Sequence, residues 1–198
     1  MKMSRYIFYP GNRSQVLGAC CEALKQKGYG VVDRPCESVT HLLLPVPSFQ
    51  EDGSIKGGGD LKDLLEKLPP GITVVGGFLN HPLLSGYATM DLLKDASYLA
   101  DNAAITAYCA LRLAMMELPV MLRGCQVLVI GWGRIGKCLS ALLWALEAEV
   151  TVVARKEEDR AIAHALGYHA EAPWKLGREL DRFQLIYNTV PAAVLTEE

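Results

Sequence analysis

The chain has 198 residues, of which 51% are apolar, enough for one large domain or two small ones. Its formal net charge is −2 at pH 7 and its pI is about 6.1, so nucleic acid is not an expected partner. Its apolar runs are too short, or too interrupted by charge, for a signal peptide or a membrane span. We therefore expect a cytoplasmic protein that contacts no membrane.

The cysteines and histidines give no sign of a metal site. The six cysteines contain no C-x-x-C pair, and the four histidines lack the spacing of metal ligands. Small thiols in helical patterns are commonly buried and reduced. We therefore expect reduced cysteines and no bound metal.

The first hundred residues alternate strand patterns with helical ones. The expected strands are RYIFYP, YGVVD, THLLLPVP and ITVVGG. Residues 13–27 predict an amphipathic helix, residues 60–67 a short one, and SFQEDGSIKGGGD a loop or mobile flap between strands. This alternation favours a parallel sheet covered by helices. We expect a flavodoxin-like α/β domain over residues 1–100, on the substrate side of the protein.

Residues 101–119, DNAAITAYCALRLAMMELP, predict one long helix that links two domains and ends at Pro119. Its larger side chains fall on one stripe at three- and four-residue spacing: Ile105, Tyr108, Cys109, Arg112, Met115 and Met116. We expect the two methionines to pack in a core. Clefts form where two domains join, so a cleft is expected beside this helix.

A glycine-rich turn follows the apolar run at residues 126–130. Its residues are Gly131, Trp132, Gly133, Arg134, Ile135 and Gly136. A strand pattern precedes this G-x-G-x-x-G turn, a helix pattern follows it, and EVTVVA returns as a second strand. In that context the glycines permit a tight turn, a close approach of pyrophosphate and close helix packing. The sequence predicts a Rossmann site that binds a dinucleotide at a helix N-terminus.

The end of the second strand indicates which dinucleotide is preferred. An NAD site carries an acidic residue there for the ribose 2′-OH, whereas this chain has Ala154, followed by Arg155 and Lys156. Two cations are suited to a 2′-phosphate, which a carboxylate would repel. Glu157 and Glu158 follow directly and remain available to a ribose. The pattern therefore favours NADP over NAD.

The remaining residues continue the Rossmann pattern. We expect a helix at 157–166, a strand in YHAEA, a helix at about 174–180 and a strand in FQLIYNTVP. The turn after that last strand lies beside the nicotinamide in such domains. It contains Asn188, Thr189, Val190 and Pro191. A complete fold needs two more strands, so the Rossmann domain over 120–198 is expected to be incomplete at its C-terminus.

These stretches together resemble the A subunit of dipicolinate synthase. The resemblance rests on the order and spacing of GNRSQ, LLLPVP, EDGSI, VVGG, DNAAITAYCALRLAM, VLVIGWGRIG, ARK and NTVPAAVL. It implies the two-domain plan shared with D-2-hydroxyacid dehydrogenases and S-adenosylhomocysteine hydrolase. It also implies NAD(P)-dependent oxidation of dihydrodipicolinate to dipicolinate during sporulation. The expected place is the mother-cell cytoplasm, and the expected partner is a flavoprotein B subunit.

Several residues are candidates for binding the small dicarboxylate substrate. Arg13, between the first strand and its helix, is expected to clamp a carboxylate, and Asn12 stands where the family usually has an acid. Asn102 and Thr106, on the long helix, are expected to donate hydrogen bonds to the substrate. The sequence identifies no catalytic acid or base. We also expect a homo-oligomer.

Two other functions remain open from the sequence. One is a D-2-hydroxyacid dehydrogenase-like oxidoreductase, whose catalytic residues would fall largely after residue 198. The other is a non-catalytic, cofactor-binding partner of a flavoprotein, which agrees with the absence of a recognisable acid–base pair.

Overall fold

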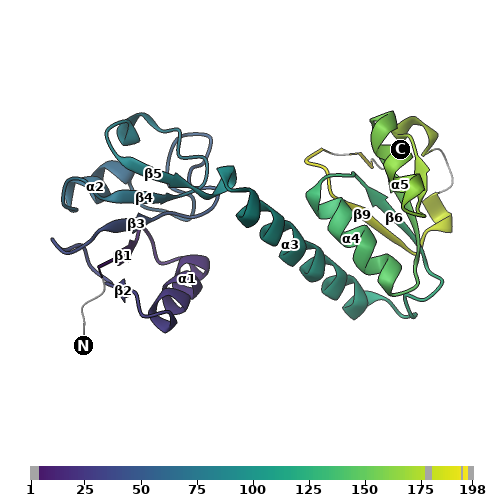
Figure 1. Cartoon of the computed structure of the whole chain (residues 1–198), viewed down its shortest axis with the longest axis horizontal. Helices are drawn as coiled ribbons and strands as arrows, with labels where there is room; N and C mark the ends of the chain where they lie inside the picture. Colours follow the sequence, from purple (N-terminus) through teal and green to yellow (C-terminus); the bar gives the residue numbers. More distant parts are fainter. Residues whose placement is uncertain (1–4, 177–179, 193, 196–198) are drawn as a thin grey trace. The chain divides into compact units, whose positions relative to one another are not determined.

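A computed structural model of the chain describes residues 5–176, 180–192 and 194–195. The chain divides into two compact units, Met1–Leu99 and Ala100–Glu198. Both are built on parallel sheets whose strands are connected by helices or loops, so the α/β prediction is confirmed (Figure 1). Among the described residues, no helix is long and apolar enough to cross a membrane.

The N-terminal unit has a five-stranded parallel sheet in the order β2-β1-β3-β4-β5. Its elements are β1 (Ile7–Pro10), α1 (Gln15–Gln26), β2 (Gly30–Val31), β3 (His41–Leu43), α2 (Leu61–Glu66), β4 (Thr73–Gly76), the 3-10 helix η1 (Pro82–Leu84), β5 (Ala88–Asp91) and the 3-10 helix η2 (Leu92–Lys94). This order is the flavodoxin-like arrangement. Side chains alternate between faces: Leu43 and Val75 pack toward α1, whereas Leu42 and Val74 pack toward α2.

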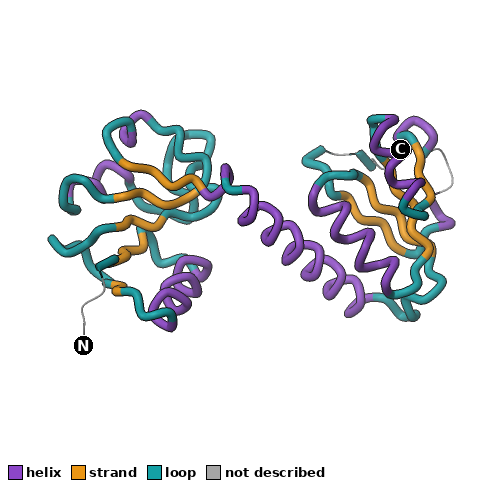
Figure 2. Tube along the Cα trace, viewed as in Figure 1, coloured by secondary structure: helices purple, strands orange, loops and turns teal. Residues whose placement is uncertain are grey.

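The C-terminal unit has a four-stranded parallel sheet in the order β8-β7-β6-β9. Its strands are drawn in orange and its helices in purple in Figure 2. Its elements are α3 (Ala96–Glu117, which begins in the N-terminal unit), β6 (Gln126–Ile130), α4 (Arg134–Ala145), β7 (Glu149–Val153), α5 (Glu157–Ala165), β8 (His169–Glu171), the 3-10 helices η3 (Pro173–Lys175) and η4 (Leu180–Arg182), and β9 (Leu185–Asn188). Helices α3, α4 and α5 share one core with β6 and β7. Residues from η4 and the segments beside it, including Phe183, cover the opposite face.

The glycine-rich segment at residues 48–60 is a loop, but it is not the free flap that its composition suggested. Phe49 and Ile55 pair as an antiparallel bridge, and Ile55 is fully buried. Ser48 is also fully buried, and its hydroxyl accepts a hydrogen bond from the Gly77 N–H. Ile55, the buried isoleucine in this glycine-rich and charged segment, therefore anchors the segment to the core.

Two element predictions were incomplete. The edge strand β5 was not predicted, because Ala88–Asp91 is short and mostly exposed and lacks a run of large apolar residues. Helix α3 begins five residues before the predicted start at Asp101, because the Asp95 carboxylate accepts the Tyr98 N–H at 2.7 Å and initiates the helix.

The prediction that Met115 and Met116 pack in a core was wrong. They are 55% and 68% exposed, and Ile105 and Tyr108 on the same stripe are exposed as well. The buried face of α3 consists of Ala103, Ala107 and Leu111. Small side chains let the helix approach the sheet closely, so the larger side chains face outward.

The helix expected at about 174–180 is replaced, where the chain is described, by the 3-10 turn η3. Residues 177–179 lie outside the described part. The six cysteines are free thiols. Within the described residues, no three His, Cys, Asp or Glu side chains gather as a metal cluster.

Candidate functional site

The glycine turn after β6 depends on the lack of side chains at two of its positions. Gly131 has a φ of +109°, which favours glycine, and a Cβ there would lie 2.6 Å from Thr189 Oγ1. A Cβ on Gly136 would collide with the Gly131 carbonyl and lie 3.2 Å from the same hydroxyl. These two glycines let α4 start directly above β6.

Gly133 differs from the other two glycines. A Cβ on it would meet no atom of the described residues within 4 Å, and its φ of −77° suits any residue. Its surroundings are therefore open space. The described residues do not require glycine at this position, which is the one where such turns let a pyrophosphate approach the backbone.

The start of α4 presents unpaired hydrogen-bond donors. Gly133 caps the helix without a side-chain hydrogen bond. Among the described residues, the N–H groups of Trp132 and Gly133 have no acceptor. The first N–H groups of a helix lack intrahelical partners as well. Together they form a site suited to an anionic group such as pyrophosphate.

A cavity of about 690 Å³ lies over this turn. Its lining includes eight of the residues predicted to bind the cofactor: Gly131, Trp132, Gly133, Ala154, Arg155, Lys156, Val190 and Pro191. The sequence reasoning missed further lining residues: Ile130, Val153, Asp159, Pro173, Ala192 and Val194. Asp159 lies in the first turn of α5, and no local sequence pattern places that turn over the end of β7.

The side chains at the end of β7 are differently engaged. Ala154 is buried, whereas Arg155 is exposed and its side chain has no partner among the described residues. The Lys156 ammonium lies 3.2 Å from Glu158, in an exposed ion pair of modest strength. The free cation at this rim of the cavity is therefore Arg155.

Trp132 is in the glycine turn, but its side chain belongs to the protein core. It is 6% exposed and packs edge-on against Tyr168 at 5.6 Å between ring centroids. Its indole N–H is buried without a partner among the described residues. Arg134, by contrast, is exposed on the first turn of α4.

The turn after β9 is held by its own hydrogen bonds. Thr189 donates from both its N–H and its hydroxyl to the Ile130 carbonyl, each at 2.9 Å. The Asn188 side chain accepts the Val190 N–H and donates to the Ala192 carbonyl. These bonds fix the turn beside the glycine loop.

A second cavity, of about 480 Å³, lies against the same turn. Its lining brings together predicted residues from three elements: Thr106 from α3, Ile135 from α4, and Asn188 to Pro191 after β9. Tyr187 also lines it, donates weakly to the Ala110 carbonyl at 3.5 Å, and has its pKa raised by burial. The Thr106 hydroxyl donates to the Asn102 carbonyl at 2.7 Å, so it is available to a ligand mainly as an acceptor.

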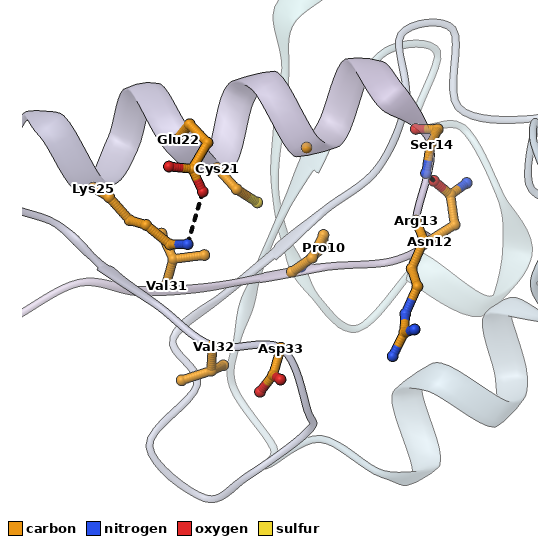
Figure 3. A pocket seen from close by; sticks show the side chains of 11 residues that line it. Pro10, Asn12, Arg13, Ser14, Cys21, Glu22, Lys25, Val31, Val32 and Asp33 are labelled. Carbon is orange, nitrogen blue, oxygen red and sulfur yellow. Dashed lines mark hydrogen bonds and ion pairs between the residues drawn. The ribbon is translucent and has the colours of Figure 1, made fainter.

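The N-terminal unit has its own cavity, of about 530 Å³, beside the start of α1 (Figure 3). Arg13 and Asp33 line it from the segments after β1 and β2, and Lys25 and Glu22 form an ion pair at 2.8 Å across one turn of α1. The Glu22 carboxylate raises the pKa of Lys25. The cavity therefore carries charges of both signs.

Asn12 is engaged by the protein rather than free. Its amide nitrogen donates to the carbonyls of Lys56 and Gly58, and its side-chain oxygen accepts the Ser14 N–H. It thus fixes the glycine-rich loop to the start of α1. Arg13, next to it, is exposed.

No family model matches the sequence, and a comparison with curated proteins finds no match. Solved structures do match. The A subunit of dipicolinate synthase from Bacillus halodurans aligns with a TM-score of 0.73 at 22% identity, over 97% of this chain and 76% of that chain. The chain has the fold of the dipicolinate synthase A subunit.

The A chain of dipicolinate synthase from Bacillus subtilis gives the same TM-score of 0.73 at 20% identity, over 100% of this chain and 76% of that one. A D-lactate dehydrogenase from Sporolactobacillus sp. aligns with a TM-score of 0.56 at 16% identity, over 94% of this chain and 62% of that one. The predicted likeness to the A subunit of dipicolinate synthase and to the D-2-hydroxyacid dehydrogenase plan is therefore confirmed for the fold. The chain therefore shares its parallel α/β fold with these enzymes.

Proposed function

We propose that this protein is an NADP-dependent oxidoreductase that oxidises dihydrodipicolinate to dipicolinate. One observation carries the proposal: the cavity over the glycine turn combines backbone N–H groups with an arginine at the end of β7, and neither has a partner among the described residues. The fold shared with the A subunit of dipicolinate synthase supports the choice of substrate.

The residues around the cavity fit a dinucleotide. The N–H groups at Trp132, Gly133 and the start of α4 would bind the pyrophosphate. Gly131 and Gly136 would collide with neighbouring atoms if they carried a Cβ, so the close turn is built for backbone contact. The turn at Asn188–Pro191 would hold the nicotinamide half.

NADP is preferred in this proposal because Ala154 leaves room at the strand end and the Arg155 guanidinium has no partner in the described part of the chain. Asp159 acts in the opposite direction, since its carboxylate lines the same cavity and repels a phosphate. Arg155 prevails because a guanidinium binds phosphate through two parallel hydrogen bonds.

On the substrate side, Arg13 would bind a carboxylate of the dicarboxylate substrate, next to Asn12. Asn12 would contribute by fixing the loop, given its bonds to Lys56 and Gly58. Asn102 and Thr106 complete the proposed substrate contacts from α3. Thr106 lines the cavity beside the nicotinamide turn.

The nicotinamide ring would supply an acceptor for the hydride that leaves the dihydropyridine ring. Aromatisation of that ring favours the loss, so the protein need only align the reactants and exclude water. The described residues that line the two C-terminal cavities include no histidine. The proton that is lost together with the hydride would therefore not pass to an imidazole among those residues.

The proposal places the reaction in the mother-cell cytoplasm during sporulation. Its partners would be further copies of this chain and a flavoprotein B subunit. The absence of a histidine among the described residues at these cavities also favours a second candidate, a non-catalytic protein that binds the cofactor for the flavoprotein. Measuring oxidation of fresh dihydrodipicolinate with and without the flavoprotein separates the two. Production of NADPH by this chain alone would exclude the second candidate.

Arg155→Asp tests the cofactor assignment. The variant should weaken NADPH binding about a hundredfold and strengthen NADH binding, because the new carboxylate repels a 2′-phosphate and accepts a ribose hydroxyl. The matched control is Arg123→Asp, which makes the same charge change at an exposed residue paired with Glu147 and away from the cavity. Equal effects of the two variants would contradict the assignment.

A further inference from the structure

Arg160, on α5, connects three segments around the cofactor cavity without lining it. Its guanidinium nitrogen donates to the Ala154 carbonyl at 2.8 Å and to the Arg155 carbonyl at 2.7 Å. Its guanidinium carbon lies 5.5 Å from the centre of the Trp174 ring in η3. Arg160 therefore joins the end of β7, the first turn of α5 and the segment after β8.

The backbone that Arg160 holds carries the residues that matter for the ribose end of the cofactor. Ala154 and Arg155 both line the cavity, and so does Pro173, the neighbour of Trp174. Each of the two hydrogen bonds has a charged donor, which makes them stronger than neutral ones. Trp174 is 74% exposed, so it backs the guanidinium at the surface and not in a core.

The charges nearby explain why the direction of Arg155 matters. Glu158 pairs with Lys156, and Asp159 presents a carboxylate to the cavity itself. The Arg155 guanidinium attracts a 2′-phosphate and the Asp159 carboxylate repels it. Binding is therefore favourable only if the phosphate lies closer to Arg155 than to Asp159. Fixing the Arg155 backbone reduces the entropy lost when its side chain binds.

We propose that Arg160 is a positioning residue for cofactor choice, which fixes the Arg155 backbone so that its guanidinium meets the ribose 2′-phosphate. This inference rests on the proposed NADP site. It assigns to Arg160 a role that acts through Arg155. The nucleotide itself is contacted by Arg155 and not by Arg160.

The test measures binding of two small probes to the whole chain by calorimetry. Adenosine 2′,5′-bisphosphate and adenosine 5′-monophosphate differ only in the 2′-phosphate. Arg160→Gln should weaken binding of the bisphosphate about tenfold and that of the monophosphate less than about twofold. Equal weakening of both probes would mean a purely structural role and would overturn the proposal.

A double-mutant cycle with Arg155→Ala tests whether Arg160 acts through Arg155. In the Arg155→Ala background, Arg160→Gln should cause no further loss of bisphosphate affinity. Additive losses would show that Arg160 acts on the phosphate directly, which contradicts the proposal.

Arg160→Lys keeps the charge but replaces the planar guanidinium with a single ammonium. It should lose about as much bisphosphate affinity as Arg160→Gln, because the ammonium cannot make these contacts in the same geometry, and wild-type affinity would overturn the proposed role of the guanidinium. Trp174→Leu leaves the Arg160 hydrogen bonds intact and should cause a smaller loss, about threefold, with the same selectivity. The Trp174→Leu variant tests the proposal if the Arg160 variants do not fold. Unchanged bisphosphate affinity in this variant, or equal weakening of both probes, would contradict the proposal.

Failure of the underlying function looks different. If the unmodified chain binds neither probe nor NADPH, the nucleotide site itself is absent. If it binds the bisphosphate tightly and Arg160→Gln leaves that affinity unchanged, only the role of Arg160 is rejected.

Discussion

The two units share a parallel α/β plan, but they finish the carboxyl edge of the sheet differently. In the C-terminal unit, the N–H groups of Trp132 and Gly133, in the turn after β6, have no partner among the described residues, and a cavity of about 690 Å³ lies above this turn. In the N-terminal unit, protein groups satisfy the turn after β4. The Ser48 hydroxyl accepts the Gly77 N–H, and the Asp91 carboxylate accepts the N–H groups of Phe78 and Leu79.

The helix starts differ in the same way. In the N-terminal unit, Ser14 caps α1 and Asp60 caps α2 through their side chains, whereas α4 starts at Gly133 with no side-chain cap. A side-chain oxygen at the helix start occupies the donors that a phosphate would use. The same parallel α/β plan therefore leaves donors open to an anion only at the helix start where the described residues supply no acceptor.

The largest expected effect comes from adding a side chain at the carboxyl edge of the C-terminal sheet, called here the open edge because the Trp132 and Gly133 N–H groups have no partner there among the described residues. In Gly136→Ala, the new Cβ collides with the Gly131 carbonyl, so α4 must move away from the turn. NADPH affinity should fall by at least about a hundredfold, as measured by calorimetry. Gly18→Ala in α1, where a Cβ meets nothing within 4 Å, is the matched control and should leave affinity unchanged. If Gly136→Ala bound NADPH with wild-type affinity, the claim that the carboxyl edge of the C-terminal sheet binds the nucleotide would be contradicted.

The next effect concerns the carboxyl edge of the N-terminal sheet, called here the closed edge because Ser48 and Asp91 accept the N–H groups after β4. Ile55→Ala removes a fully buried side chain that anchors the glycine-rich loop over β3 and β4. It should lower the free energy of unfolding by about 2–5 kcal/mol in denaturant titrations. NADPH affinity should not change, because Ile55 belongs to the other unit. A stability loss below about 1 kcal/mol would mean that the loop is not part of the core.

A smaller effect separates nucleotide affinity from the stability of the fold. In Gly133→Ala the new methyl meets no protein atom, so the thermal midpoint should stay close to that of the wild type. NADPH should bind about tenfold more weakly, because the methyl occupies the path of the pyrophosphate. Loss of stability together with affinity would assign Gly133 a structural role instead.

The smallest effect is a pH dependence within the N-terminal unit. Partial burial beside Phe8 and Tyr6 lowers the pKa of His41 below its usual 6.5. The unfolded chain then binds the proton more tightly, so the free energy of unfolding should fall as the pH drops through 6.5 and below. His41→Gln should flatten this part of the curve in denaturant titrations repeated across pH. An identical slope in the variant would show that other groups cause it.

The sequence predicted the open edge better than the closed one. Gly131, Gly133, Gly136 and Arg155 are read from local spacing, because the turn, the helix start and the next strand end are all set by short segments. The closed edge depends on contacts across 12 to 46 residues, such as those from Asp91 to Leu79 and from Asn12 to Gly58. No local pattern encodes such contacts.

The residues missed at the site have the same physical origin. Asp159 and Arg160 were read as ordinary residues of a helix, because the sequence does not show that the first turn of α5 folds back over the end of β7. The prediction of the buried face of α3 was wrong for another reason. Its larger side chains suggested the buried face, whereas the helix packs through Ala103 and Ala107.

The central claim is that the C-terminal unit binds a dinucleotide with a 2′-phosphate. Calorimetric titration of the whole chain with NADPH and, in parallel, with NADH tests it most directly. The account predicts binding of one NADPH per chain, at least about tenfold tighter than NADH. Tighter binding of NADH, or no binding of either nucleotide, would contradict it.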